Sequence, residues 1–351
     1  MTAEHKKVGY ALGGGAARGL FHIGVLSVLE EYGIRPDIIA GTSMGSIIGA
    51  MYASGLNTDD LKHIACNINW KQIVRLTDIV TLPKSGLIQG KRIVALLTSI
   101  LGDINFSQLK CKYAVVAADL YTGQEVIYTE GSLIEAIRAS ISIPGIFTPV
   151  FYRGRYMVDG GLINVVPVNV CRELGADFVV GVNAIPDPSS GVMPVVISSA
   201  ANNDNYSGNS GISDDEMRKP IIPGAHVKFH ESRINSIDKA VNRFLLYRQP
   251  KMQRLIARKP SSIFSIRPKI DTGEPNMFEV LSQSLSIIEY RIAIENLTNA
   301  DIAITPMEQT VGYWAFHRAA EAIEAGERTT RLLIQQDEST RRRLASFRSS
   351  G

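Results

Sequence analysis

The fold is decided by residues 36–55, PDIIAGTSMGSIIGAMYASG. The stretch opens with a short apolar run at 38–40, which is typical of a buried parallel strand. From Met44 onward, apolar residues recur at helical spacing. Between the two lies Gly41-Thr-Ser-Met-Gly45, a G-x-S-x-G pentapeptide. A strand, a tight turn and a helix in this order predict a nucleophile elbow that holds Ser43 in a strained conformation at the edge of a sheet.

Each part of this elbow has a physical reason. A β-carbon at Gly41 or Gly45 would collide with a neighbouring element where the chain doubles back. The N-terminus of the following helix favours negative charge near the Ser43 oxygen. The pentapeptide also arises by chance, and Gly/Ser turns join strands to helices in many α/β folds. A second feature is therefore needed to support an enzyme.

That second feature is a glycine loop near the N-terminus. Residues 8–12 predict a first strand, which runs through Gly13, Gly14 and Gly15 into an apolar-periodic helix. Bare backbone N–H groups at such a place can bind a phosphate or form an oxyanion hole. The G-x-G-x-x-G fingerprint fails, because Ala16 or Arg18 occupies a required glycine position in either register. The oxyanion hole is favoured because this loop and the Ser43 elbow follow adjacent strands at the same sheet edge.

A carboxylate stands at the end of a later strand. Residues 155–158 predict that strand, and Asp159-Gly160-Gly161 follows it. The carboxyl ends of strands are where open α/β sheets place their chemistry. The alternative is a plain turn, since Asp-Gly is a common turn dipeptide.

Composition narrows the class of protein. The chain has 351 residues, 45% of them hydrophobic, which allows a sizeable core. A net charge of +3, from 37 basic and 34 acidic residues, gives no reason to expect nucleic acid as a partner. The three cysteines, at 66, 111 and 171, are unclustered and indicate buried thiols in a reducing compartment. With no signal-peptide or bilayer-spanning segment apparent, we expect a cytoplasmic protein.

Four regions are expected along the chain: a catalytic core at 8–185, a polar insertion or linker at 186–275, a strand and helices at 276–335 that complete the core, and a basic flexible tail at 336–351. Within the insertion, residues 243–259 interleave basic and apolar side chains. This pattern fits peripheral contact with an anionic membrane, or a solvated helix face packed on the domain. Helical spacing at 314–325 predicts a helix ended by Gly326.

Four motifs in this order resemble the patatin-like phospholipases, in particular the bacterial branch related to neuropathy target esterase (NTE). They are Leu12-Gly-Gly-Gly-Ala-Ala-Arg-Gly19, Gly41-Thr-Ser-Met-Gly45, Ser140-Ile-Ser-Ile-Pro144 and Asp159-Gly160-Gly161. The resemblance implies a three-layer α/β/α fold with a mostly parallel central sheet. It also implies a Ser-Asp dyad that hydrolyses acyl esters of lipids without metal or other cofactor.

Carried over to this chain, the resemblance makes Ser43 the nucleophile and Asp159 its partner. Gly13, Gly14 and Gly15 would supply oxyanion N–H groups, and Arg18 falls on the family's basic loop position. One departure is Ala16, where many members have a glycine, so a left-handed backbone at 16 would be strained.

Three alternatives remain open. A Ser-His-Asp esterase would use His226, His230 or His317 as its base, in an order that α/β hydrolases allow. An acyltransferase would use the same serine with a different acceptor. A non-catalytic lipid-binding module is the third, although Ser43, Asp159 and the glycine loop are all retained.

Overall fold

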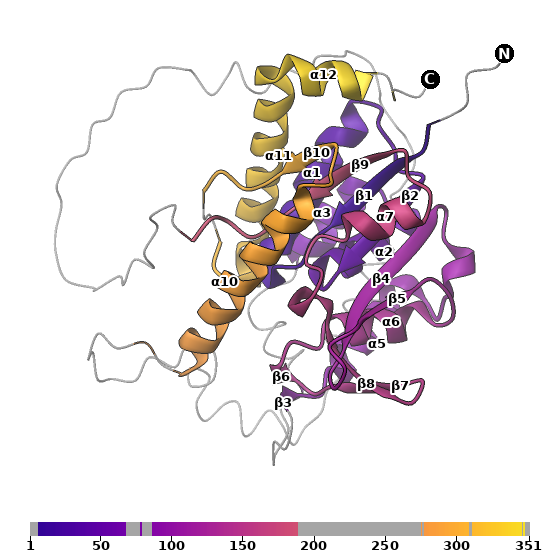
Figure 1. Cartoon of the computed structure of the whole chain (residues 1–351), viewed down its shortest axis with the longest axis vertical. Coiled ribbons are helices and arrows are strands. Elements are labelled where there is room, and N and C mark those ends of the chain that lie inside the picture. Colours follow the sequence, from indigo (N-terminus) through magenta and orange to yellow (C-terminus); the bar gives the residue numbers. More distant parts are fainter. Residues whose placement is uncertain are drawn as a thin grey trace.

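The computed structural model describes residues 6–67, 78, 86–188, 275, 277–308, 311–345 and 347. Most of the predicted insertion at 186–275 lies outside these residues, and so does the whole basic segment at 243–259. The remainder forms a sheet with helices on both faces (Figure 1).

The main sheet of the described chain has eight strands, most of them parallel. Its order is β10 (Ile302–Ile304), β9 (Phe178–Val182), β1 (Val8–Leu12), β2 (Ile38–Thr42), β4 (Lys112–Asp119), β8 (Arg155–Asp159) and β7 (Val150–Tyr152). The first five are mutually parallel, whereas β8 and β5 (Glu125–Tyr128) pair antiparallel with β4, and β7 pairs antiparallel with β8. A separate parallel pair joins β3 (Gly86–Ile88) to β6 (Gly145–Phe147). The loops after β1 and β2 therefore emerge side by side at one carboxyl edge.

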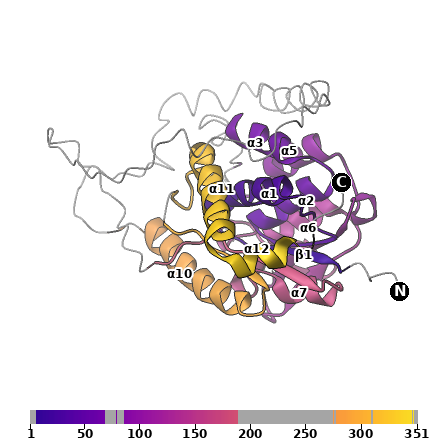
Figure 2. The same cartoon turned by 90° about the horizontal axis from the view of Figure 1, so that it is seen from above.

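Helices cover both faces of this sheet, because successive strand residues point to opposite sides. Tyr10 and Leu12 belong to the larger apolar core, and Ala11 between them belongs to the smaller one. The larger core packs under α1 (Phe21–Glu31), α2 (Met44–Ala53), α3 (Thr58–Asn67), α5 (Lys91–Leu101), α6 (Leu133–Ser140) and α11 (Ala319–Gln336). The smaller core packs under α7 (Val168–Glu173) and α10 (Met277–Leu297). Figure 2 shows these layers from above, and the expected three-layer α/β/α fold is confirmed.

Helices α1 and α11 cross at two glycines. A β-carbon at Gly24 would stand 2.0 Å from the Ile323 carbonyl oxygen, and one at Gly326 would stand 2.2 Å from the Phe21 carbonyl oxygen. Both obstacles are backbone atoms, which cannot move aside without separating the helices. The sequence-based prediction that Gly326 ends its helix was wrong, because Gly326 serves this close approach and α11 continues to Gln336.

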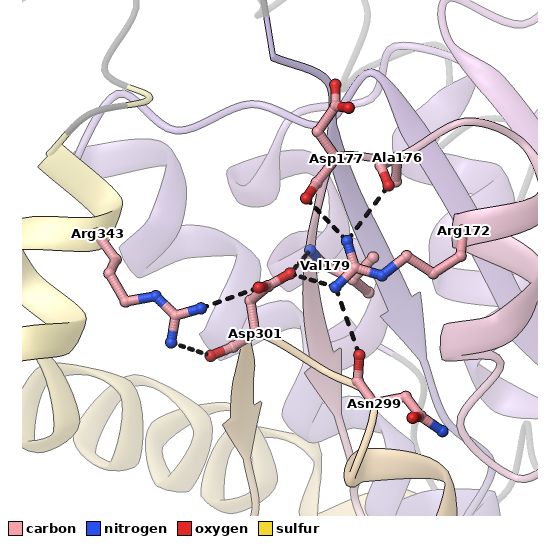
Figure 3. A network of polar contacts seen from close by, with 7 residues as sticks. All are labelled: Arg172, Ala176, Asp177, Val179, Asn299, Asp301 and Arg343. Atoms are coloured by element: carbon pink, nitrogen blue, oxygen red, sulfur yellow. Dashed lines mark hydrogen bonds and ion pairs between the residues drawn. The ribbon is translucent and has the colours of Figure 1, made fainter.

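The predicted flexible tail is also wrong for residues 338–345, which form helix α12 (Glu338–Ala345) with Leu344 buried. Figure 3 shows how α12 is held. The Asp301 carboxylate accepts hydrogen bonds from Arg343 at 2.9 Å, from Arg172 of α7 at 2.5 Å and from the backbone N–H of Val179 at 2.7 Å. The basic tail is ordered here because Asp301 supplies an opposite charge at the edge of the sheet.

Candidate active site

Ser43 occupies the turn between β2 and α2, as the elbow pattern predicts. Its backbone has φ 52° and ψ −120°, a conformation that non-glycine residues rarely adopt. A β-carbon at Gly41 would stand 2.6 Å from the Gly45 carbonyl oxygen, and one at Gly45 would stand 2.0 Å from that of Leu12. Both flanking positions therefore require glycine, and the strained serine is held in place by tight packing on either side.

A second serine supports this strained turn. The backbone N–H of Ser43 donates to Ser140 Oγ at 2.8 Å, and the Ser140 hydroxyl donates to the Val116 carbonyl at 2.6 Å. Ser140 thus ties the elbow to strand β4. The sequence analysis quoted Ser140 only as part of a motif and assigned it no role. Nothing in its spacing from Ser43 reveals the contact.

Asp159 lies within hydrogen-bonding distance of the elbow serine. It ends β8, whose antiparallel pairing with β4 places the carboxylate beside the end of β2. The Ser43 hydroxyl donates to Asp159 Oδ2 at 2.6 Å, and the Gly161 N–H donates to Oδ1 at 2.8 Å. The side chain is 2% exposed, and this burial raises the pKa of Asp159 from 3.8 to about 7, although both hydrogen bonds oppose the rise. A carboxyl group with this pKa can accept a proton near neutral pH.

The glycine loop lies beside the elbow, but its first two amides are already used. The N–H of Gly13 donates to the Val182 carbonyl at 2.9 Å, and that of Gly14 donates to the Val165 carbonyl at 3.1 Å. The expectation that Gly13 and Gly14 present free N–H groups is therefore corrected. Within the described chain, the N–H groups of Gly15 and Ala16 have no hydrogen-bond acceptor.

The end of the glycine loop has an unusual backbone conformation. Gly15 has φ 131°, and Ala16 has φ 49°, which is the left-handed conformation that the sequence analysis identified as a source of strain. A buried histidine braces this loop, since His22 Nε2 lies 2.8 Å from the Gly13 carbonyl oxygen. Burial lowers the pKa of His22 to about 4, so the ring is neutral and donates this hydrogen bond.

Arg18 does not face the same space as Ser43. Its guanidinium is buried, donates to Ser286 Oγ at 2.7 Å and to the Val311 carbonyl at 3.3 Å, and lies 5.4 Å from the centre of the Tyr313 ring. These contacts join the glycine loop to α10 and to the segment before α11. The expected substrate-binding role of Arg18 is replaced by a bracing one, because the side chain is already used inside the protein.

An apolar cavity of about 200 Å³ opens beside Ser43. Its walls come from α2, α3 and α5, with further side chains from the loop after α6, from β6 and from the segment before α11; representative lining residues are Ile48, Ile64, Leu97, Phe147 and Trp314. Ala16 and Met44 border the cavity next to the serine. A hydroxyl group at one side of an otherwise apolar cavity suits an ester with a long hydrocarbon chain.

Within the described chain no histidine is hydrogen-bonded to Ser43; His63, on α3, lies 3.0 Å from the side-chain nitrogen of Asn67. His22 contacts Gly13, not Ser43, and His317 is exposed in a short 3₁₀ turn, η4 (Phe316–Arg318). His226 and His230 lie outside the described residues. In the described part of the chain, the Ser43 hydroxyl donates its hydrogen bond directly to Asp159.

Comparison with known proteins identifies the family of this chain. The family model for patatin-like phospholipases matches residues 10–172, a span that includes the glycine loop, Ser43 and Asp159. An uncharacterized NTE family protein of Mycobacterium tuberculosis is 30% identical over 328 residues, which cover 91% of this chain and 89% of that protein. The chain belongs to the patatin-like, NTE-related family.

Other similar proteins match only part of the chain. A second uncharacterized NTE family protein of Mycobacterium tuberculosis is 34% identical over 196 residues, covering 55% of this chain and 33% of that protein. Lysophospholipase NTE1 of Candida albicans is 30% identical over 182 residues, covering 51% of this chain and 13% of that protein. Membership of this family supports lipid hydrolysis as the general activity. Among the described helices, none is both long and apolar enough to cross a bilayer.

Proposed function

We propose that this protein is a serine hydrolase for acyl esters of lipids, of the phospholipase A or lysophospholipase type. Ser43 is the nucleophile and Asp159 is its general base. One observation carries the proposal: the 2.6 Å hydrogen bond from the Ser43 hydroxyl to a buried carboxylate, beside an apolar cavity. The proposal needs no metal ion or cofactor.

In the first step, Asp159 accepts the Ser43 proton while Ser43 Oγ attacks the ester carbonyl. An aspartate in water is too weak a base for this task, since its pKa is about 4. Burial raises the pKa of Asp159 to about 7, which brings its proton affinity close to what neutral pH requires. Protonated Asp159 then gives its proton to the departing alcohol or lysolipid.

Negative charge develops on the carbonyl oxygen during the attack. The amides of Gly15 and Ala16 are the loop donors left to receive it, and Ala16 borders the cavity beside Ser43. We add the N–H of Met44, because the first amides of a helix lack partners within it and the residue after the nucleophile commonly donates here. One such donor contributes about 3–4 kcal/mol to transition-state stabilisation.

The second step releases the acyl group. Asp159 activates a water molecule, which attacks the acyl-enzyme and restores Ser43. An acyltransferase would differ only in which alcohol reaches this intermediate. The apolar cavity favours long acyl chains in either case, since its lining offers hydrocarbon contacts along α2, α3 and α5.

The direct Ser43–Asp159 contact favours a dyad over a Ser-His-Asp esterase, since no imidazole stands between the two groups. It also favours an enzyme over a lipid-binding module, which has no need for a buried carboxylate or a strained serine.

We further propose peripheral contact with a membrane through the carboxyl edge of the sheet. The exposed aromatic side chains there are Tyr121, in the turn after β4, and Phe151 and Tyr156, which are paired on strands β7 and β8; the Phe151 and Tyr121 ring centres lie 5.0 and 6.1 Å from that of Tyr156. Arg153 and Arg155 lie on the same hairpin, where they pair with Glu130 at 3.5 Å and with Asp119 at 3.7 Å; both side chains stay more than half exposed and so remain accessible to anionic headgroups.

Labelling with a fluorophosphonate tests the hydrolase directly, since the reagent reacts with an activated serine. We expect wild type to be labelled on Ser43 and Ser43→Ala to be unlabelled. Ser54→Ala, at the other end of α2, is a matched control that should retain labelling. Equal labelling of Ser43→Ala and wild type would remove Ser43 from the mechanism.

A further inference from the structure

A second buried carboxyl group lies next to the candidate dyad and has no part in the mechanism above. Glu289 projects from α10 and is 5% exposed. Its oxygens accept hydrogen bonds from the Tyr313 hydroxyl at 3.2 and 3.3 Å. A buried carboxyl group with one neutral donor is costly to ionise, so its presence requires an explanation.

Gly161 shows how close this group is to Asp159. A β-carbon at Gly161 would stand 3.1 Å from Glu289 Oε1 and 3.2 Å from Asp159 Oδ1. Both carboxyl groups therefore border the same small space beside Gly161. Asp159 uses its other oxygen, Oδ2, for Ser43, so Glu289 faces Asp159 from the side opposite the nucleophile.

The other charged or titratable groups that face Glu289 in the described chain are Arg18 and Tyr313. Arg18 makes its hydrogen bonds to Ser286 and Val311, so it attracts Glu289 only through space. Tyr313 stays protonated, since burial and the nearby carboxyl groups raise its pKa well above the ordinary value. Neither neighbour neutralises Glu289 by direct ion pairing.

We propose that Glu289 is a positioning residue that sets the proton affinity of Asp159, with the two carboxyl groups titrating as one coupled pair across Gly161. The inference rests on the proposed function, because it concerns the base of that same site. Gly161 is part of the arrangement, since a side chain there would occupy the space that the two carboxyl groups share.

The order of ionisation follows from their surroundings. Asp159 has a pKa of about 7, and its hydrogen bonds from Ser43 and Gly161 favour its charged form. Burial, followed by the charge of Asp159, raises the pKa of Glu289 to about 8. Because two donors favour ionised Asp159 and the Tyr313 hydroxyl alone favours ionised Glu289, Asp159 ionises first as the pH rises. Above about pH 8 Glu289 ionises and repels the Asp159 charge.

That repulsion acts on the proton transfer. When Asp159 takes the Ser43 proton, negative charge moves away from Glu289 toward the ester oxygen. Ionised Glu289 therefore favours the step, and we expect a second rise in rate near pH 8. The rise is about three- to tenfold, because only one difference contributes: Glu289 repels a charge on Asp159 more strongly than a charge on the ester oxygen.

The test is the rate of fluorophosphonate labelling of Ser43 in the full chain between pH 5 and pH 10. Wild type should show two rises, near pH 7 and near pH 8. Glu289→Gln should keep the first rise and lose the second. Glu295→Gln, an exposed acidic position on the same helix, is the matched control and should match wild type.

A second variant tests the same inference if Glu289→Gln does not fold. Tyr313→Phe removes the donor that favours ionised Glu289, so it should move the upper rise to higher pH and leave the lower one unchanged. Unchanged profiles in both variants, or an upper inflection that lowers the rate, overturn the inference. No labelling of wild type at any pH would overturn the proposed function and this inference together, whereas normal labelling with an unchanged profile overturns this inference alone.

Discussion

Replacing Asp159 with Asn should stabilise the protein while it strongly slows hydrolysis. Burial raises the pKa of Asp159 from 3.8 to about 7, so the folded state resists ionisation that the unfolded chain accepts. Each tenfold change in proton affinity corresponds to about 1.4 kcal/mol, which makes the full effect about 4 kcal/mol above pH 7. Protonated Asp159 therefore contributes this free energy to the folded state of wild type below pH 4, and the contribution is lost as the pH rises through 7. The amide side chain of the Asp159→Asn variant carries no charge, so the variant avoids this loss.

The measurement is urea unfolding of wild type and Asp159→Asn at pH 4.5 and pH 8.5. We expect the variant's advantage in unfolding free energy to grow between these values, toward about 4 kcal/mol. The new amide can still accept from Gly161 and donate to Ser43, although the Ser43 hydroxyl hydrogen loses its acceptor, a cost that does not depend on pH. Esterase activity should fall by about 10²–10⁴. An advantage that does not change with pH would refute the claim that burial controls the Asp159 pKa.

Leu97→Trp should fill the cavity and lower kcat/KM for long-chain esters about tenfold or more, leaving short-chain esters nearly unaffected; a series of ester chain lengths measures this. Ser140→Ala leaves the buried Ser43 N–H without its acceptor, so the labelling rate should fall while circular dichroism stays unchanged. Gly24→Ala places a β-carbon 2.0 Å from a backbone oxygen of α11 and should cost about 3 kcal/mol or more, read from urea unfolding. Asp301→Ala removes the acceptor shared by α7, α12 and β9, and should destabilise by about 2–4 kcal/mol without moving the pH profile of labelling. The assigned role of the cavity is contradicted if Leu97→Trp acts equally on all chain lengths, and that of Ser140 if Ser140→Ala is labelled at the wild-type rate. Wild-type stability in Gly24→Ala or Asp301→Ala would contradict the packing role given to that residue.

The elbow and the aspartate could be predicted because each is a local pattern at the end of a strand. A glycine on either side of Ser43 and two after Asp159 are short-range signals of tight backbone packing. Parallel pairing of β1 with β2 then brings the glycine loop beside the elbow. These signals need only a few consecutive residues and a rule about strand edges.

Which amides of the glycine loop are free could not be predicted. Gly13 and Gly14 donate to carbonyls of Val182 and Val165, which enter the structure much later in the chain. Glu289 is likewise brought to Asp159 by α10, across a stretch with no periodic relation to the motif. Long-range contacts of this kind leave no spacing signal.

The tail shows the same limitation on a smaller scale. A run of arginines at 341–343 is typical of a solvated end, yet Arg343 pairs with Asp301 and stacks 5.3 Å from the Phe178 ring centre. The charge pattern of the tail alone does not reveal whether the fold brings a residue of opposite charge next to it.

The most direct test of the account compares wild type and Ser43→Ala on a mixed lipid extract, with products identified by mass spectrometry. The account predicts free fatty acids, and lysolipids or their headgroup alcohols, from wild type only. Release of the same products at the same rate by Ser43→Ala would contradict it.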